Sequence, residues 1–152
     1  MYINSMDTNI TIEKQVSSII SLYSSGKIEE ALRNVDLIIR SRSNEAILYN
    51  IRGACYTELR KFKKAMNNYK IALSINPNYA EAHNNLGNAL KELNQLDNAL
   101  ESYQKAIKLK PNFTEAYNNI GTLYQNLGKI DASLKSFIEA LKIDPEYVEA
   151  FN

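Results

Sequence analysis

The sequence predicts an all-α fold in which similar helical hairpins stack into a solenoid. Proline, glycine and alanine recur at an interval of 34 residues, and between them apolar residues recur at three- and four-residue steps. The recurring positions are Pro77, Pro111 and Pro145; Gly53, Gly87 and Gly121; and Ala72, Ala106 and Ala140. Residues 80–113 and 114–147 are identical at 12 of 34 places. A fixed period of this length indicates a repeat protein rather than a domain with one central core.

The first helix of a unit is clearest in residues 80–93. Ala82, Leu86 and Leu90 form an apolar stripe along it. Gly87 lies inside this helix, although glycine costs about 1 kcal/mol there relative to alanine. We therefore expect a neighbouring helix to approach Gly87 too closely for a side chain.

A turn and a second helix complete the unit. Residues 94–95 interrupt the stripe, and a second apolar stripe runs through residues 96–109. Pro111 ends this helix, because proline lacks an N–H and restricts the residue before it. The asparagine after each proline, Asn78 or Asn112, is expected to cap the next helix.

The period divides the chain into a leader, four units and the start of a fifth. The expected segments are the N-terminal leader 1–11, a divergent unit 12–45 that forms the N-terminal cap, units 46–79, 80–113 and 114–147, and a truncated fifth unit that starts at 148–152. Unit 12–45 has Ile19 in place of the packing glycine and Ser43 in place of the proline. Terminal repeats are often atypical in this way. We expect the chain to be cut from a longer protein.

Residues 46–147 resemble the tetratricopeptide repeat (TPR) family. An aromatic or similar residue opens each unit, a glycine and then an aromatic residue or leucine follow, and a proline closes it. Besides the glycines and prolines, these positions are Tyr49, His83 and Tyr117, then Tyr56, Leu90 and Tyr124. The resemblance implies a right-handed superhelix of helix–turn–helix units. It also implies a concave groove, lined by the first helix of each unit, that binds an extended peptide or a partner helix.

Composition excludes several classes of partner. The formal net charge is +1, whereas proteins that bind nucleic acid or anionic membranes depend on basic excess. No apolar run approaches the roughly 20 residues of a membrane span, and the N-terminus lacks the apolar core of a signal peptide. We therefore expect protein or peptide partners, no nucleic acid, no membrane and a cytoplasmic location.

Groups that could support catalysis do not converge in the sequence. His83, the only histidine, falls at a packing position, and Cys55 beside an apolar stripe is expected to be a small buried filler. Residues 24–27 (Ser-Ser-Gly-Lys) lack the upstream glycine and following Ser/Thr of a nucleotide-binding loop. The basic run 60–64 is expected to be a solvated turn, with a phosphate or nucleic-acid contact as the alternative. We predict a protein that is not an enzyme and has no catalytic residue, metal site or cofactor.

Amide side chains recur on one face of the predicted first helices. The candidate groove residues are Asn50, Ala54, Glu81, Asn84, Asn85, Asn88, Lys91, Glu115, Asn118, Asn119, Thr122 and Gln125. A carboxamide offers two donors and an acceptor, so it can pair with both the N–H and the C=O of a ligand backbone. An amide-rich face therefore favours binding of an extended peptide without reading its sequence, although an exposed helix face also carries polar residues with no ligand.

Asn85 and Asn119 resemble the asparagine ladder in the TPR superhelix of the O-GlcNAc transferase family. Ser17 and Ile51 occupy the same place in the first two units, so the ladder has two rungs. TPR co-chaperones that bind a C-terminal carboxylate carry basic residues on this face. Glu81 and Glu115 occupy candidate places here and would repel such a carboxylate.

Three functions follow from these patterns. The first is a non-catalytic protein–protein interaction module that binds a peptide or partner helix in its groove. The second is the substrate-recruiting N-terminal region of a larger modifying enzyme, similar to a glycosyltransferase. The third is a scaffold with weak end-to-end self-association, through an apolar stripe at Leu134, Ile138 and Leu141 that lacks a covering neighbour.

Overall fold

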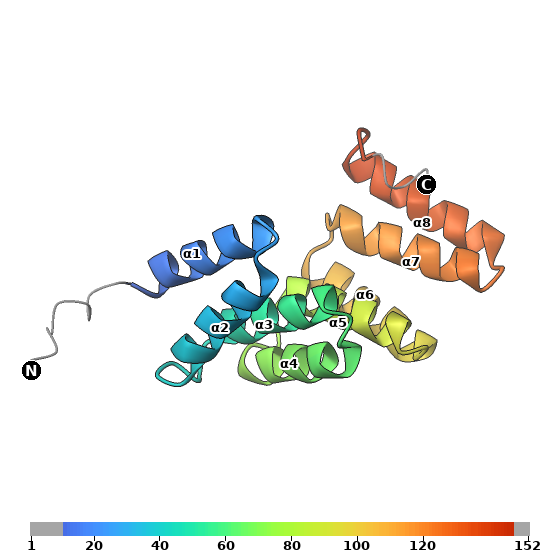
Figure 1. Ribbon diagram of the computed structural model, residues 1–152. Helices are drawn as coiled ribbons and strands as arrows, with labels where there is room; N and C mark the ends of the chain where they lie inside the picture. Colours follow the sequence, from blue (N-terminus) through green and yellow to red (C-terminus); the bar gives the residue numbers. More distant parts are fainter. Residues whose placement is uncertain (1–10, 148–152) are drawn as a thin grey trace, which may run out of the picture.

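The computed structural model describes residues 11–147 and places eight helices, and no strand, in this part of the chain (Figure 1). The helices are α1 (Ile12–Ser24), α2 (Ile28–Ile39), α3 (Ala46–Glu58), α4 (Phe62–Ile75), α5 (Ala80–Glu92), α6 (Leu96–Leu109), α7 (Thr114–Asn126) and α8 (Ile130–Ile143). They follow one another along the molecule, with α1 and α8 at opposite ends. The expected all-α fold is confirmed.

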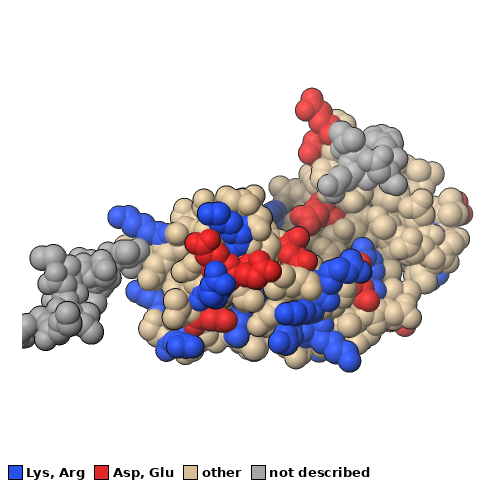
Figure 2. Space-filling view, viewed as in Figure 1, with Lys and Arg blue, Asp and Glu red and all other residues tan. Residues whose placement is uncertain are grey.

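The helices pack mainly against their neighbours in the chain. The most extensive contacts join α3 with α4, α5 with α6 and α7 with α8, and the next join α4 with α5, α2 with α3 and α6 with α7. Each predicted unit from 12–45 to 114–147 thus holds one helical hairpin, although the division into units stays a prediction. The fifth unit (148–152) and residues 1–10 of the leader lie outside the described residues. Figure 2 shows charges of both signs on the surface, in keeping with the net charge of +1.

A residue with a left-handed backbone follows two positions after the end of each first helix. The positive φ angles are 74° at Gly26, 54° at Arg60, 58° at Asn94 and 69° at Gly128, again at intervals of 34 residues. Glycine and asparagine adopt this conformation at little cost, whereas arginine does so only under strain. The expected turn at 94–95 is confirmed. The turn expected at 60–64 covers only residues 60–61, because α4 already begins at Phe62. Arg60 stands out as the unusual residue of the series.

The glycines inside the first helices make room for an aromatic ring. A Cβ atom on Gly87 would lie 2.5 Å from Cε1 of Tyr103, and one on Gly121 would lie 2.5 Å from Cε1 of Phe137. A Cβ atom on Gly53 would likewise lie 2.5 Å from Cε1 of Tyr69. The close approach that the sequence predicted therefore comes from a side chain of the second helix in the same unit.

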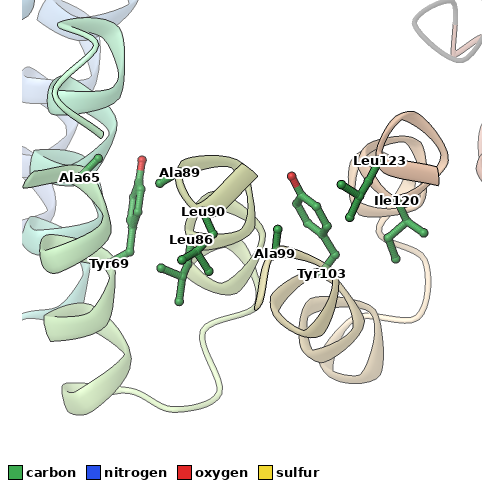
Figure 3. Packing of buried hydrophobic residues seen from close by; sticks show 9 residues of the cluster. All are labelled: Ala65, Tyr69, Leu86, Ala89, Leu90, Ala99, Tyr103, Ile120 and Leu123. Atoms are coloured by element: carbon green, nitrogen blue, oxygen red, sulfur yellow. The ribbon is translucent and has the colours of Figure 1, made fainter. Parts of the chain in front are cut away.

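These rings also connect consecutive units. Figure 3 shows the ring of Tyr103 between its own unit and α7, where Leu123 and Ile120 lie, and Tyr69 in the same position next to α5. Tyr103 and Leu123 are both fully buried. The core is therefore a row of similar layers, each shared by two units, rather than one central cluster.

The helix ends agree only in part with the prediction. The second helices α4 and α6 stop two residues before Pro77 and Pro111, as expected. The caps of α5 and α7, however, are Tyr79 and Phe113, and neither makes a side-chain capping hydrogen bond. The expected caps Asn78 and Asn112 were wrong, because the chain at this point buries an aromatic residue: Phe113 is only 8% exposed.

Candidate functional site

The predicted groove residues lie on three helices that form the inner side of the array. All twelve belong to α3, α5 and α7. These first helices contact each other directly, α3 with α5 and α5 with α7, whereas the second helices make no comparable contact with one another in residues 11–147. In a stack of hairpins, the closer layer is the concave one. The first helices therefore line the concave face.

Asparagines of consecutive units bind each other across this face. Asn85 donates from Nδ2 to Oδ1 of Asn50 over 3.1 Å, and Asn119 donates from Nδ2 to Oδ1 of Asn84 over 2.9 Å. In each pair the two asparagines are 35 residues apart, so each hydrogen bond joins one unit to the next. We call these four side chains the amide network.

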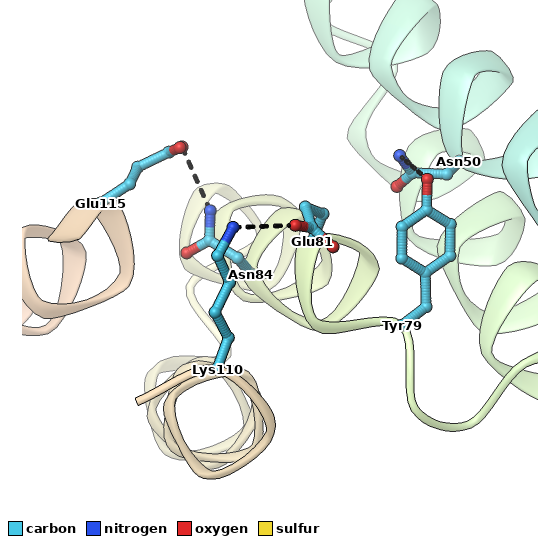
Figure 4. A network of polar contacts seen from close by, with 6 residues as sticks. All are labelled: Asn50, Tyr79, Glu81, Asn84, Lys110 and Glu115. Atoms are coloured by element: carbon cyan, nitrogen blue, oxygen red, sulfur yellow. Dashed lines mark hydrogen bonds and ion pairs between the residues drawn. The ribbon is translucent and has the colours of Figure 1, made fainter. Parts of the chain in front are cut away.

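Further polar contacts surround the amide network (Figure 4). Asn50 donates to the hydroxyl of Tyr79 over 3.3 Å, and Asn84 donates to Oε1 of Glu115 over 3.1 Å. Lys110 pairs with Glu81 at 3.1 Å. Burial alone would raise the pKa of Glu81, but hydrogen bonds from the backbone and from Lys110 outweigh it and lower the pKa. Glu81 therefore stays ionised as part of an ion pair.

Burial divides the predicted residues into two groups. Asn84 is 1% exposed and Asn118 is 8% exposed, so these side chains belong to the interior. Asn50, Asn85 and Asn119 are half-buried. The other half-buried residues are Ala54, Asn88, Lys91 and Thr122, and the exposed ones are Glu81, Glu115 and Gln125. The second group is therefore open to solvent on this face, whereas Asn84 and Asn118 are buried beneath it.

The two buried asparagines, Asn84 and Asn118, differ in their hydrogen bonds. Asn84 uses both ends of its carboxamide, as a donor to Glu115 and an acceptor from Asn119. The buried Oδ1 of Asn118 has no hydrogen-bond partner among the described residues. Thr122 donates to the backbone carbonyl of Asn118 over 3.0 Å. A buried acceptor without a partner lowers the stability of the folded state. Asn118 is therefore a polar residue in the packed interior whose carbonyl is not compensated by a hydrogen bond.

Three predicted residues meet in one open pocket of about 460 Å³, which we call the amide-lined pocket. They are Asn88, Lys91 and Asn119. The phenol of Tyr103 donates to Oδ1 of Asn88 over 2.7 Å, which leaves the Asn88 amide N–H groups as donors. The remaining lining residues are Thr57, Glu58, Arg60, Phe62 and Glu92. The pocket is thus shared by three consecutive units.

The sequence interpretation placed Glu92 on the same side as Lys91, but it did not place Thr57, Glu58, Arg60 or Phe62 there. The 34-residue register that placed Lys91 and Gln125 on the groove side also places Thr57 there, so a signal existed for it. No comparable signal marked Arg60 and Phe62, because they lie in the turn after α3 and at the start of α4.

A second pocket lies at the α1 end of the same face. It measures about 440 Å³ and its lining is mainly aliphatic. The lining residues are Ile12, Glu13, Val16, Ser17, Ile20, Glu45 and Ile47. Ser17 occupies the register of Asn85 and Asn119. The concave face therefore changes from aliphatic near α1 to amide-rich near α5 and α7.

Reactive groups are isolated in the described chain. Burial raises the pKa of the Cys55 thiol to about 11, so it is a neutral, buried thiol, as the sequence predicted. His83 hydrogen-bonds through Nε2 to the carbonyl of Pro77 at 2.9 Å. Residues 11–147 hold no group of three or more His, Cys, Asp or Glu side chains suited to a metal ion, and none of their helices has the length and hydropathy of a membrane span.

Two models of the same repeat family match the chain. The model described as "TPR repeat" matches residues 53–93 and 87–128, and the one described as "Tetratricopeptide repeat" matches residues 114–147. Among curated proteins, no significant sequence match is found.

Solved structures show the same architecture. A crystal structure of MamA is 26% identical, with a TM-score of 0.78 over 90% of this chain and 80% of that one. TTC0263, a thermophilic TPR protein of Thermus thermophilus, is 21% identical, with a TM-score of 0.83 over 91% and 76%. The APC/C heterotetramer Cut9–Hcn1 gives 21% identity and a TM-score of 0.84 over 93% of this chain and 29% of that one. These likenesses confirm the all-α superhelix.

Proposed function

Because the chain belongs to the tetratricopeptide repeat family, we propose that it is a protein–protein interaction module without catalysis of its own. Its concave face binds an extended peptide segment of a partner protein. The observation that carries this proposal is the amide-lined pocket, where α5 and α7 bring Asn88 and Asn119 to one opening. Such a pocket offers hydrogen-bonding groups from two consecutive units to the same ligand.

The chemistry of the pocket suits a peptide backbone. Asn88 has its Oδ1 occupied by Tyr103, so it presents N–H donors. Asn119 uses one N–H of its Nδ2 on Asn84, and its Oδ1 is left as a carbonyl acceptor. A peptide unit offers one acceptor and one donor, which matches this pair. Internal contacts therefore orient the two amides for opposite roles.

The expected affinity is modest. Each net hydrogen bond contributes about 0.5–1.5 kcal/mol, and association has a large entropic cost. A ligand that uses two or three such bonds and few apolar contacts binds on the order of micromolar. Orientation of both amides before binding reduces the ordering cost and supports an interaction of this strength.

A displayed library of random peptides of about 12 residues tests the proposal, because an extended peptide of that length spans the face of several units. Peptides selected on the wild type are then titrated against Asn88→Ala/Asn119→Ala. The control is Asn98→Ala, which alters an exposed asparagine on the outer helix α6. We expect about a tenfold loss for the double variant, as two lost hydrogen bonds imply, and no loss for the control. Equal affinity for all three proteins would remove the amide-lined pocket from the function.

A second candidate is end-to-end association with another copy. Both ends of the array expose large apolar side chains: Leu37 on α2 is 59% exposed, and Ile130, Leu134 and Ile138 on α8 are 63%, 58% and 43% exposed. Light scattering over a concentration series, with Leu134→Lys for comparison, tests this candidate. A monomer mass at every concentration would count against it. Recruitment of a substrate to a larger modifying enzyme stays a prediction.

A further inference from the structure

The turn after α3 and the first residues of α4 carry a dense group of positive charges that take part in none of the ion pairs of residues 11–147. Arg60, Lys61, Lys63 and Lys64 surround Phe62, and we call these five residues the basic turn. The four cations are exposed. The ion pairs found in residues 11–147 all use other lysines and arginines. Figure 2 shows such a gathering of Lys and Arg on one part of the surface. The charges of the basic turn are therefore not neutralised within the described chain.

The basic turn also reverses the charge pattern of the equivalent turns. The other second helices, α2, α6 and α8, begin with acidic residues in their first turn. Acidic side chains there stabilise a helix, because its N-terminus carries a partial positive charge. Helix α4 has no acid in its first turn and instead has Lys63 and Lys64. The two lysines repel each other and the partial positive charge at the N-terminus of α4. This repulsion destabilises the ligand-free protein and favours binding of an anionic ligand.

The basic turn is continuous with the amide-lined pocket. Arg60 and Phe62 line that pocket, and they also line an open depression of about 300 Å³ with Lys61, Lys63, Lys64 and Leu93. The guanidinium of Arg60 lies over the ring of Phe62, 5.4 Å from its centroid. A chain that leaves the pocket past Arg60 therefore meets the lysines next.

We propose that the groove ligand is an acidic peptide whose Asp or Glu side chains lie on the basic turn while its neighbouring backbone lies in the amide-lined pocket. This inference rests on the proposed function and adds the chemistry of the partner. The ligand is acidic at one end only, because Glu81 and Glu115 occupy the opposite ends of α5 and α7. At that edge Glu115 disfavours acidic side chains, and Glu81 is already paired with Lys110.

The surrounding charges favour a peptide over a nucleic acid. Glu58 and Glu92 line the amide-lined pocket together with Arg60 and Lys91, and Glu58 accepts a hydrogen bond from the hydroxyl of Tyr23 over 3.0 Å. A nucleic acid carries a charge at every residue and would meet these carboxylates. A peptide can place its charges on the basic turn alone.

The test uses a fluorescent peptide of about 12 residues, with glutamates in one half and Gly-Ser in the other, which behaves as a flexible chain. The same peptide with Gln for each Glu, the same peptide with Lys for each Glu, and a single-stranded oligothymidine complete the set. Binding is measured by anisotropy at about 50 mM and about 300 mM salt, because the Debye length shortens across this range. The variants are Lys63→Gln/Lys64→Gln and, as a control of equal charge change, Lys108→Gln/Lys135→Gln on α6 and α8.

We expect the acidic peptide to bind more tightly than its Gln and Lys counterparts. Exposed charge pairs change binding by up to about fivefold each, so Lys63→Gln/Lys64→Gln should weaken the acidic peptide by about three- to tenfold at low salt. The control should change it by less than about twofold. Equal binding of the Glu and Gln peptides, or equal effects of both variants, would overturn the inference. Tighter binding of oligothymidine, lost in the same variant, would assign the basic turn to nucleic acid and overturn it too.

One further variant separates this inference from the proposed function. Asn88→Ala/Asn119→Ala should weaken the Glu and Gln peptides by the same factor, since it removes contacts to the backbone. An unchanged affinity in this variant, with a loss in Lys63→Gln/Lys64→Gln, would retain the acidic partner and refute the groove. A loss in the asparagine variant alone would retain the groove and refute the acidic partner.

Discussion

Replacement of Gly87 by alanine tests how the units are held together. Gly87 lies in the middle of α5, where alanine is the better helix former by about 1 kcal/mol. A Cβ atom at this place would lie 2.5 Å from the ring of Tyr103, which is closer than two carbon atoms can come. Either the ring or the helix must move, so helix propensity and packing predict opposite effects on stability.

The structure indicates that packing decides the outcome. Tyr103 is completely buried, and its hydroxyl is tied to Asn88 at 2.7 Å. Overpacking of a core costs about 1–3 kcal/mol, and loss of the hydroxyl contact adds about 0.5–1.5 kcal/mol. After the gain in propensity, Gly87→Ala should lower the free energy of unfolding by about 2 kcal/mol, or Tm by about 4–8 °C.

Gly121→Ala is the matched control. Its Cβ would lie at the same 2.5 Å from the ring of Phe137, but Phe137 is only half-buried and has no hydroxyl to hold it. That ring can yield, so the packing cost should fall to about the gain in propensity, and the net change should stay below about 1 kcal/mol. Urea denaturation followed by circular dichroism at the helix band measures both variants.

A second-site change identifies the clash as the cause. Gly87→Ala in a Tyr103→Leu background should cost less than in the wild type, because the smaller side chain vacates the place of the new methyl group. An equal cost in both backgrounds would refute the reasoning. So would a stabilised Gly87→Ala protein, since it would show that the ring moves at no cost.

Three further changes probe the other unusual positions, each followed by urea denaturation. Asn84→Ala leaves Asn119 without its acceptor and should lower the free energy of unfolding by about 1–3 kcal/mol, whereas Asn98→Ala at an exposed place should be nearly neutral. Arg60→Gly removes the strain of a φ angle of 54° and should stabilise by about 1 kcal/mol; an unchanged or lower stability would contradict this. Burial raises the pKa of the Cys55 thiol from 9.0 to about 11, so its contribution is complete below pH 9 and lost as the pH rises through 11. The free energy of unfolding should therefore fall between pH 9 and pH 11, and fall less in Cys55→Ala.

The period was sufficient to predict the architecture. Proline, glycine and aromatic residues repeat because each unit must meet the same neighbour in the same way, so a 34-residue interval implies a stack. The interval also predicted a close approach at Gly87 but not its source, since a sequence does not show that the ring of Tyr103 fills the space. The caps at Asn78 and Asn112 were wrong for a similar reason. Propensity favours asparagine at a helix start, but burial of the next residue decided where each helix begins.

The candidate site could be placed on the correct helices but not resolved into roles. Asn84 and Asn85 are identical and adjacent, and composition gives no reason to separate them. A turn of about 100° per residue makes Asn84 an interior residue and leaves Asn85 half-buried. The bonds to Asn119 and Asn50 also run over 35 residues rather than 34. Comparison of residues 34 positions apart finds the repeat. It does not find the hydrogen bonds between units, because their partners are 35 positions apart.

Those crossing contacts make stacking and binding depend on the same side chains. The distance between Asn88 on α5 and Asn119 on α7 is set by the angle between two units, and no rigid frame outside the stack fixes that angle. The bond between Asn84 and Asn119 spans the same two helices and orients one of the two pocket amides. A ligand that bridges Asn88 and Asn119 would require the units to stand at that angle, and the free protein already favours the angle through Asn84. Loss of Asn84 should thus weaken peptide binding without removing any contact to the peptide. By linkage, Asn84→Ala should cost more unfolding free energy in the bound protein than in the free protein, because the free protein can relax to another angle and the bound one cannot.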